Sequence, residues 1–209
     1  AGFGRSVACA GDVNGDGYSD VIIGAYFYSE VVNIQEGRAF VYYGSAAGLS
    51  ATPDSILDDA NQANCYFGTT VSSAGDINAD GYCDVIVGSP QYDEGANDNE
   101  GRAFVYYGSA AGLSATPGST LSDGNQVYAF FGCSVACAGD VNGDGYSDVI
   151  IGSYLYDDGA NGDEGVAFVY HGSATGLSVT PNSIPNDADR VLSYFGYSVA
   201  CAGDVNGDG

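Results

Sequence analysis

Residues 6–24 read Ser-Val-Ala-Cys-Ala-Gly-Asp-Val-Asn-Gly-Asp-Gly-Tyr-Ser-Asp-Val-Ile-Ile-Gly, and the same stretch returns without change at 134–152. A second stretch, residues 36–53, is repeated without change at 100–117. A Phe-Gly pair marks the start of each copy and recurs every 64 residues, at Phe3, Phe67, Phe131 and Phe195. A period of this kind is typical of repeat proteins, in which each unit packs on its neighbours.

The period divides the chain of 209 residues into three full units and the beginning of a fourth, at 3–66, 67–130, 131–194 and 195–209. In the first unit, the pattern of β-branched and aromatic residues predicts three strands and a weaker fourth one, at 6–13, 20–25, 38–43 and within 55–66. Turns rich in Gly, Asn, Asp, Ser and Pro separate these strands. No window carries the apolar period of an amphipathic helix, so we expect little helix.

Four antiparallel strands in each unit define the expected fold. Residues 20–25 are apolar in succession, which is typical of a strand covered on both faces. Units that bury such faces on one another are the blades of a β-propeller. We therefore predict an all-β fold over 1–209, a β-propeller of four-stranded antiparallel blades with three full blades and the first strand of a fourth. Such a chain is incomplete by itself, because propellers have about 4–8 blades.

The motif order in each unit resembles a known repeat. The order is Phe-Gly, then Gly-Asp-Val-Asn-Gly-Asp-Gly-Tyr-Ser-Asp, then Gly-Ala-Tyr or Gly-Ser-Pro. This order is similar to the FG-GAP repeat, and the resemblance covers essentially the whole chain. That repeat forms the blades of integrin alpha-subunit propellers and of many bacterial secreted proteins. The resemblance implies an extracellular or cell-surface propeller for adhesion or protein binding. One departure is that Pro90 alone keeps the expected proline, which Tyr26 and Tyr154 replace in the other units.

An acidic loop motif, Asp-x-Asn-x-Asp-Gly-x-x-Asp, follows the first strand of each unit. Its oxygens at positions 1, 3, 5 and 9, with a main-chain carbonyl from position 7, suit a Ca²⁺ ion, and the glycine at position 6 allows a sharp turn. We expect three complete calcium sites, at Asp12, Asn14, Asp16, Tyr18 and Asp20; at Asp76, Asn78, Asp80, Tyr82 and Asp84; and at Asp140, Asn142, Asp144, Tyr146 and Asp148. A truncated fourth site holds Asp204, Asn206 and Asp208.

These loops differ from the helix-flanked EF-hand, because position 12 is apolar (Ile23 in the first loop) and strands flank them. The alternative is a hairpin of Asx-turns that needs no metal. Three converging carboxylates without a cation would repel one another strongly, which favours calcium. We expect the metal to be structural, clamping the hairpin between the first and second strands of each blade.

A second acidic loop joins the second and third strands of each unit. Its polar residues are Glu30, Asn33 and Glu36; Asp93, Glu94, Asn97, Asp98, Asn99 and Glu100; and Asp157, Asp158, Asn161, Asp163 and Glu164. In an up-and-down blade this loop lies on the face opposite the calcium hairpins, where the resemblance places partner recognition. Tyr28, Tyr92 and Tyr156 are candidate aromatic anchors there. The alternative is a solvated loop of turn-forming residues.

Charge excludes two classes of partner. The chain has 27 acidic and four basic residues, a formal net charge of −23. Nucleic acid and anionic lipid both require a cationic face, which four arginines do not build. No apolar run approaches the 18 residues of a membrane span, so we expect no membrane insertion. Without an initiator Met, we expect a processed product, a fragment or an incompletely determined sequence.

Catalytic chemistry is not indicated. His171 is the single histidine and replaces the tyrosine found at Tyr43 and Tyr107, so it predicts no catalytic triad. The cysteines form no zinc spacing and no regular disulfide framework; Cys133 and Cys137 are too far apart along one strand to bridge, and Cys65 with Cys83 is the one local pair worth checking. We therefore predict no enzyme.

Three functions remain open. The first is an extracellular, calcium-stabilised module for adhesion or protein binding. The second is a lectin-like propeller that binds glycans, and the third is a self-assembling structural unit. The ring would close through a larger parent chain or through other copies, for example by the 195–209 segment pairing across a junction.

Overall fold

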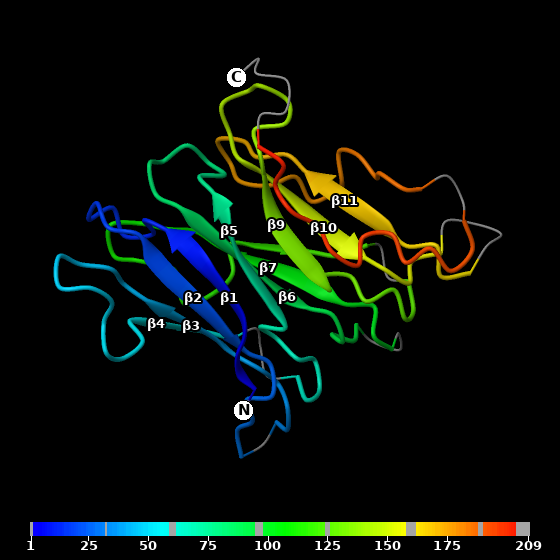
Figure 1. The fold of residues 1–209 in the computed structure, drawn as a ribbon, viewed down its shortest axis with the longest axis horizontal. Coiled ribbons are helices and arrows are strands. Elements are labelled where there is room, and N and C mark those ends of the chain that lie inside the picture. Colours follow the sequence, from blue (N-terminus) through cyan, green and yellow to red (C-terminus); the bar gives the residue numbers. More distant parts are fainter. Residues whose placement is uncertain are drawn as a thin grey trace.

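The computed structural model describes residues 2–31, 33–58, 62–94, 98–123, 126–157, 162–187 and 190–203. Within these residues it contains eleven strands and no helix. The strands form three antiparallel sheets that stand side by side (Figure 1). This arrangement confirms the prediction of an all-β fold built from antiparallel blades.

Each of the first two units forms one blade with four strands in sequence order. Blade one contains β1 (Phe3–Gly11), β2 (Asp20–Ala25), β3 (Ala39–Tyr42) and β4 (Ser55–Leu57). Blade two contains β5 (Thr70–Gly75), β6 (Asp84–Ser89), β7 (Arg102–Tyr106) and β8 (Ser119–Leu121). The second strand of blade one agrees with its expected bounds, whereas the fourth strand occupies only three residues of the expected 55–66 stretch.

The described residues of blade three form three strands, β9 (Ser134–Gly139), β10 (Asp148–Ser153) and β11 (Val166–Tyr170). Its fourth strand is reduced to a bridge between Val169 and Ser183. The cause is Pro185, which stands where the other blades have Leu57 and Leu121. The Pro185 carbonyl still accepts a hydrogen bond from Ala167 N (3.0 Å), but proline has no N–H to complete the ladder. The expectation of four strands in every unit is thus corrected for the third.

The start of the fourth unit lies against blade three without joining its sheet. Val199 N donates to Ser134 Oγ (3.0 Å), and residues 195–203 belong to none of the three sheets. In blade one the first strand pairs with the second, and no described strand forms such a pairing with residues 195–203. The predicted first strand of a fourth blade is therefore absent from the described residues.

The hydrophobic core lies between blades. One cluster joins blades one and two, with Phe67 and Val71 of blade two packed near Val41 of blade one. A second cluster joins blades two and three in the same way. The inner strands β1, β5 and β9 lie next to one another, as Figure 1 shows. The middle sheet therefore buries both of its faces on its neighbours, as the apolar pattern of residues 20–25 predicts.

Close backbone contact explains a glycine that recurs in every unit. A Cβ added to Gly24 would overlap the carbonyl oxygen of Gly68 in the next blade. The same overlap would occur between Gly88 and Gly132 and between Gly152 and Gly196. Main-chain hydrogen bonds also cross between blades, because Asp12 O accepts from Cys83 N (2.9 Å). Only glycine permits the blades to approach this closely at these positions.

In the two outer blades some apolar side chains are exposed, although the equivalent side chains of other blades are buried. Phe3 is 53% exposed, whereas the equivalent Phe67 and Phe131 are fully buried. On the other side of the arc, Val141 is 55% exposed, whereas the equivalent Val13 is fully buried. Blade one has no blade before it in this structure and blade three has none after it, so these faces are open.

The difference between Phe67 and Phe3 gives a test of packing between blades. Phe67→Ala should lower the free energy of unfolding by about 3–5 kcal/mol, since it leaves a cavity in the core. Phe3→Ala should lower it by at most about 1 kcal/mol, because the side chain is half exposed. Urea unfolding followed by tyrosine fluorescence, on a monomeric sample, measures both. Equal losses would contradict the open face of blade one.

Candidate functional site

The predicted metal loops join β1 to β2, β5 to β6 and β9 to β10. In the first loop the carboxylate of Asp12 accepts hydrogen bonds from Gly15 N (2.7 Å), Asp16 N (3.1 Å) and Gly17 N (2.8 Å). Gly17 has a φ of +89°, a conformation that favours glycine. The first aspartate thus organises the whole turn. Asp140 accepts the same three bonds in its loop, and Asp76 accepts the two from Asp80 N and Gly81 N.

The side chains at positions 3 and 5 lie beside one another. Asn14 Nδ2 is 3.3 Å from Asp16 Oδ2, and Asn14 Oδ1 accepts from Asp16 N (3.0 Å). Asp16 Oδ1 in turn accepts from Tyr18 N (2.9 Å). The same contacts recur in the second and third loops. The structure therefore brings together the first three predicted ligands of each loop on its exposed surface.

The aspartate at position 9 has a different setting. Asp20 is fully buried, and its two oxygens accept from Val13 N (2.9 Å) and Gly44 N (2.8 Å). It thereby ties the hairpin to the residue that follows the third strand, a role that the sequence did not reveal. Asp84 and Asp148 do the same in the other blades, bonding Ile77 and Gly108, and Val141 and Gly172.

Burial and like charge both act on these buried carboxyls. Burial raises the pKa of Asp20 above its ordinary value, and the negative charges of Asp16 and Asp12 add to the rise. Burial likewise raises the pKa of Asp84 to about 6, with smaller contributions from Asp80 and Asp76, although two backbone N–H groups oppose the rise. The acidic groups of one loop therefore lie within electrostatic reach of one another.

The loops fit a calcium ion in their chemistry, but only in part in their geometry. Asp12, Asn14 and Asp16 supply the hard oxygens that Ca²⁺ prefers, and their mutual repulsion is of the kind that a cation relieves. Within the described residues, however, no three acidic, histidine or cysteine side chains converge to hold a metal. Asp20 points its oxygens at backbone N–H groups. Calcium ligation therefore stays a prediction, and Asp204, Asn206 and Asp208 lie outside the described residues.

At the opposite end of the strands, the candidate anchors Tyr28, Tyr92 and Tyr156 are half-buried. Their rings contact Phe40, Phe104 and Phe168 of the third strands, with centroids 6.1, 5.9 and 5.4 Å apart. The guanidinium carbons of Arg38 and Arg102 lie 4.4 and 4.5 Å from the rings of Tyr28 and Tyr92. This packing favours a structural role for the three tyrosines.

The acidic residues of the same loops also serve the local structure. Asp93 Oδ1 accepts from Asn99 N, and Asp157 Oδ1 accepts from Asp163 N, each at 2.6 Å. Glu100 is fully buried, so the loop is not simply a solvated acidic segment. Asn97, Asp158 and Asn161 lie outside the described residues.

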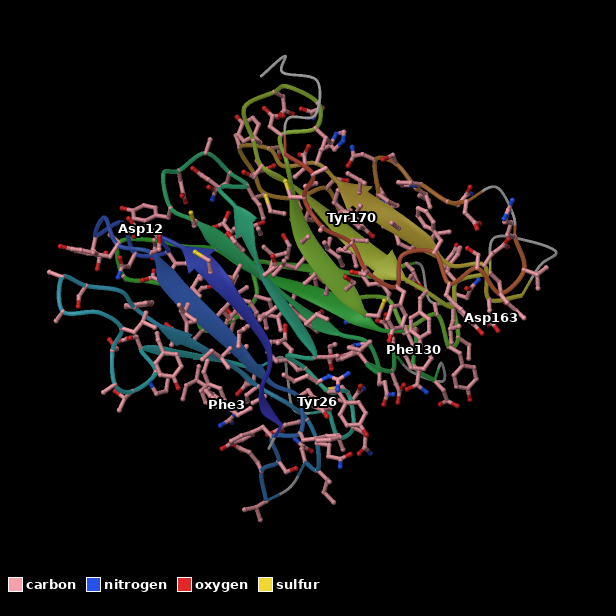
Figure 2. The ribbon with its side chains drawn as sticks, viewed as in Figure 1. Phe3, Asp12, Tyr26, Phe130, Asp163 and Tyr170 are labelled. Atoms are coloured by element: carbon pink, nitrogen blue, oxygen red, sulfur yellow. The ribbon has the colours of Figure 1, made fainter. Side chains whose placement is uncertain are left out.

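A hollow on this face was not predicted. Its volume is about 460 Å³, and its lining includes the residue that follows Phe-Gly in each unit: Arg5, Thr69, Cys133 and Tyr197. An adjoining hollow of about 240 Å³ shares Arg5 and adds Tyr26, Phe27 and Tyr66. Figure 2 shows Asp12 at one end of the strands and Tyr26 and Phe130 toward the other. Tyr26 and Tyr154, where the sequence departs from the proline of the motif, were the available signal.

No disulfide joins any two of the six cysteines, all of which the structure describes. Cys65, fully buried, donates to Glu36 O (3.1 Å), so the suggested pair with Cys83 is not formed. Cys133 and Cys137 are likewise unbridged, as their spacing predicts. His171 Nδ1 lies 3.1 Å from Asn142 Nδ2, beside the third metal loop. The part of the chain that the structure describes contains no helix with the length and apolar character of a membrane span.

Blades that share inter-blade cores and carry one acidic hairpin each define a β-propeller repeat protein. The FG-GAP repeat matches residues 3–42, 67–106 and 134–170, more than half of the chain. The chain belongs to the FG-GAP repeat family.

Curated relatives are integrin alpha chains. The chain is 37% identical to integrin alpha-4 of Xenopus laevis over 157 residues, which is 74% of this chain and 14% of the relative. It is 30% identical to integrin alpha-5 of Xenopus laevis over 212 residues, 95% of this chain and 19% of the relative. It is 34% identical to human integrin alpha-7 over 161 residues, 73% of this chain and 12% of the relative. The chain thus spans less than a fifth of the length of these relatives.

The two settings of aspartate in one loop predict mutational effects of unequal size in the presence of a chelator. Asp84→Ala should lower the free energy of unfolding by about 2–4 kcal/mol, because Ile77 N and Gly108 N lose a buried acceptor. Asp80→Ala should cost about 0.5 kcal/mol, since water replaces the exposed bond from Tyr82 N. Urea unfolding in chelator measures both. Equal losses would show that Asp84 has no special structural role.

Proposed function

We propose that this chain is part of an extracellular, calcium-stabilised propeller that binds a protein partner, as in cell adhesion. The observation that carries the proposal is the separation of two features at opposite ends of the strands. Acidic loops repeat in register at one end. A hollow lined by an arginine, aromatic rings and hydroxyls lies at the other. The relationship to integrin alpha chains supports the adhesive role and the location outside the cell.

In this proposal the ion binds at Asp12, Asn14 and Asp16, with the main-chain carbonyl of Tyr18 and the buried Asp20 completing the set. A calcium ion would supply positive charge that offsets the repulsion among these groups. Asp12 already shapes the turn through its side chain and bonds the next blade through its carbonyl oxygen. The loop therefore contributes to packing between blades, so a structural ion would stabilise more than its own hairpin.

We infer a non-catalytic role. Burial raises the pKa of Cys133 to about 11, so this thiol is a poor nucleophile at neutral pH. His171 contacts Asn142 of a metal loop. This contact is not the pairing of a histidine base with a nucleophile that catalysis would require. The remaining carboxylates of the loops are engaged with backbone N–H groups.

A glycan is the second candidate ligand, because the hollow combines aromatic rings with hydroxyl and amide groups. Phe130, Tyr154 and Tyr197 offer ring surface, and Thr69 and Gln91 offer polar atoms. Binding of the 209-residue chain to a glycan array, compared with binding to proteins, separates the two candidates.

The open blade faces support association with further blades of the same kind, from a second copy or from a longer chain. Blade one exposes the face that blades two and three bury, and blade three exposes the opposite face. The two open faces are thus complementary, because blades of nearly the same sequence join such faces within the chain.

Calcium should stabilise the chain at millimolar concentrations. At a free concentration ten times the Kd, each complete site should add about 1.4 kcal/mol to the free energy of unfolding. The combined variant Asp16→Ala, Asp80→Ala and Asp144→Ala should lose this gain, so that its melting temperature is the same with calcium as with chelator. Thermal unfolding with calcium and with chelator measures the effect, and NaCl of equal ionic strength controls for charge screening. A melting temperature that chelator leaves unchanged would refute the calcium proposal.

Association through the open faces can be measured by sedimentation. If copies close the arc, the molar mass should rise toward a dimer of six blades with concentration, and Val7→Asp or Val141→Asp should prevent the rise without unfolding the chain. Val7 is 62% exposed, which makes both variants tolerable in the monomer. A constant monomer mass would assign the missing blades to a longer chain instead.

A further inference from the structure

The repeat brings four equivalent residues to one place. Arg5, Thr69, Cys133 and Tyr197 each follow the Phe-Gly pair of their unit, and all four line the hollow of about 460 Å³. Blades of a propeller are related by rotation about a central axis that runs beside the inner strands, so equivalent positions at the ends of these strands converge. The site is therefore assembled by every unit, while its chemistry comes from the residues that differ between units.

Arg5 supplies the charge of this site. Arg38 is paired with Glu30 and Asp58, and Arg102 is paired with Glu94. Within the described ranges Arg5 has no ion pair; its guanidinium carbon lies 5.2 Å from the centroid of the Tyr26 ring. Among the described residues, no acidic side chain lines either hollow. A chain with 27 acidic residues thus keeps an unneutralised cation at the hollow, surrounded by neutral groups.

Three of the other polar groups of the hollow donate their protons within the protein. Thr69 Oγ1 donates to Tyr66 O (2.6 Å), and Thr70 Oγ1 donates to Gly132 O (2.9 Å). The Cys133 thiol donates to Gly152 O (3.3 Å). Arg5 adds a charged donor to this lining, and its planar fork matches a carboxylate.

Aromatic rings surround the arginine. Tyr154 lies 5.5 Å from Phe130 and 5.3 Å from Tyr197, measured between ring centroids. Tyr26 and Phe27 stack beside Arg5 in the adjoining hollow, with centroids 3.9 Å apart. Tyr197 is 69% exposed, so large ring surfaces face solvent at the rim. Tyrosine and arginine are enriched where proteins bind one another most strongly, which favours a protein ligand over a free anion.

We propose that this hollow binds an acidic side chain, Asp or Glu, of a protein partner. The carboxylate pairs with the guanidinium of Arg5, and the apolar neighbours of the acidic residue lie against the rings of Tyr26, Phe130 and Tyr154. The proposal rests on the proposed function, in which this end of the propeller binds a protein. It adds that the recognised group is a negatively charged carboxylate on a single side chain.

The test selects peptides from a displayed random library on the immobilised 209-residue chain with calcium present. Selected peptides should be enriched in Asp or Glu over the starting library. Arg5→Gln should weaken their binding about 10–100-fold, the loss expected for a charge-assisted hydrogen bond. Replacing the acidic residue of the peptide by its amide should have the same effect. Arg190→Gln removes the same charge from an exposed arginine outside both hollows and should leave binding unchanged.

Each alternative outcome is decisive. Arg5 is exposed, so an unchanged melting temperature for Arg5→Gln separates lost binding from lost folding. Peptides without acidic enrichment, or binding that survives Arg5→Gln, would overturn the Arg5 proposal and leave protein binding in place. Retention of no peptide would overturn both proposals. Arg5-dependent binding of glucuronate-bearing glycans, without acidic peptides, would overturn the protein partner and assign the carboxylate to a sugar.

Discussion

The side chain of Phe67 is buried between two blades, where it contacts Phe104 of its own sheet and belongs to a cluster that includes Val41 of the preceding sheet. Phe131 repeats this packing one blade further along. Because apolar burial is the main stabilising term, a single blade of this chain has little stability alone. Packing between blades therefore fixes the inner strands side by side. It also determines which loops gather at each end of the strands.

How much the sequence predicts depends on whether a feature repeats. The period, the bounds of β2 and the packing of blades on both faces of a sheet follow from residues that recur every 64 positions. The short β4 and the bridge in blade three did not follow, because edge strands are weakly specified and a single residue, Pro185, removes the ladder. The part played by Asp20 was also hidden, since its partner Gly44 N is distant in sequence.

The candidate sites divide along the same line. The acidic loops could be found because position and spacing are the same in three units, and hydrogen bonds join Asp12, Asn14 and Asp16 in one turn. The hollow could not be found in this way, because it is made of positions at which the units differ and which meet only in the folded arc. Tyr28 and its counterparts drew attention by repeating, yet they pack on the third strands. In this chain, the residues that repeat in every unit have structural roles, whereas residues that differ between units line the candidate site for binding a partner.

The outer edge of each blade has a further consequence. The last strands, β4 and β8, are three residues long, and Pro185 interrupts the third edge altogether. A long free edge would offer unpaired N–H and C=O groups to any similar strand, and three units of nearly the same sequence supply many such strands. Short, interrupted edge strands offer few unpaired N–H and C=O groups to a strand from a non-neighbouring blade. The weakest strands of the fold thus protect a chain of near-identical repeats from edge-to-edge aggregation during folding.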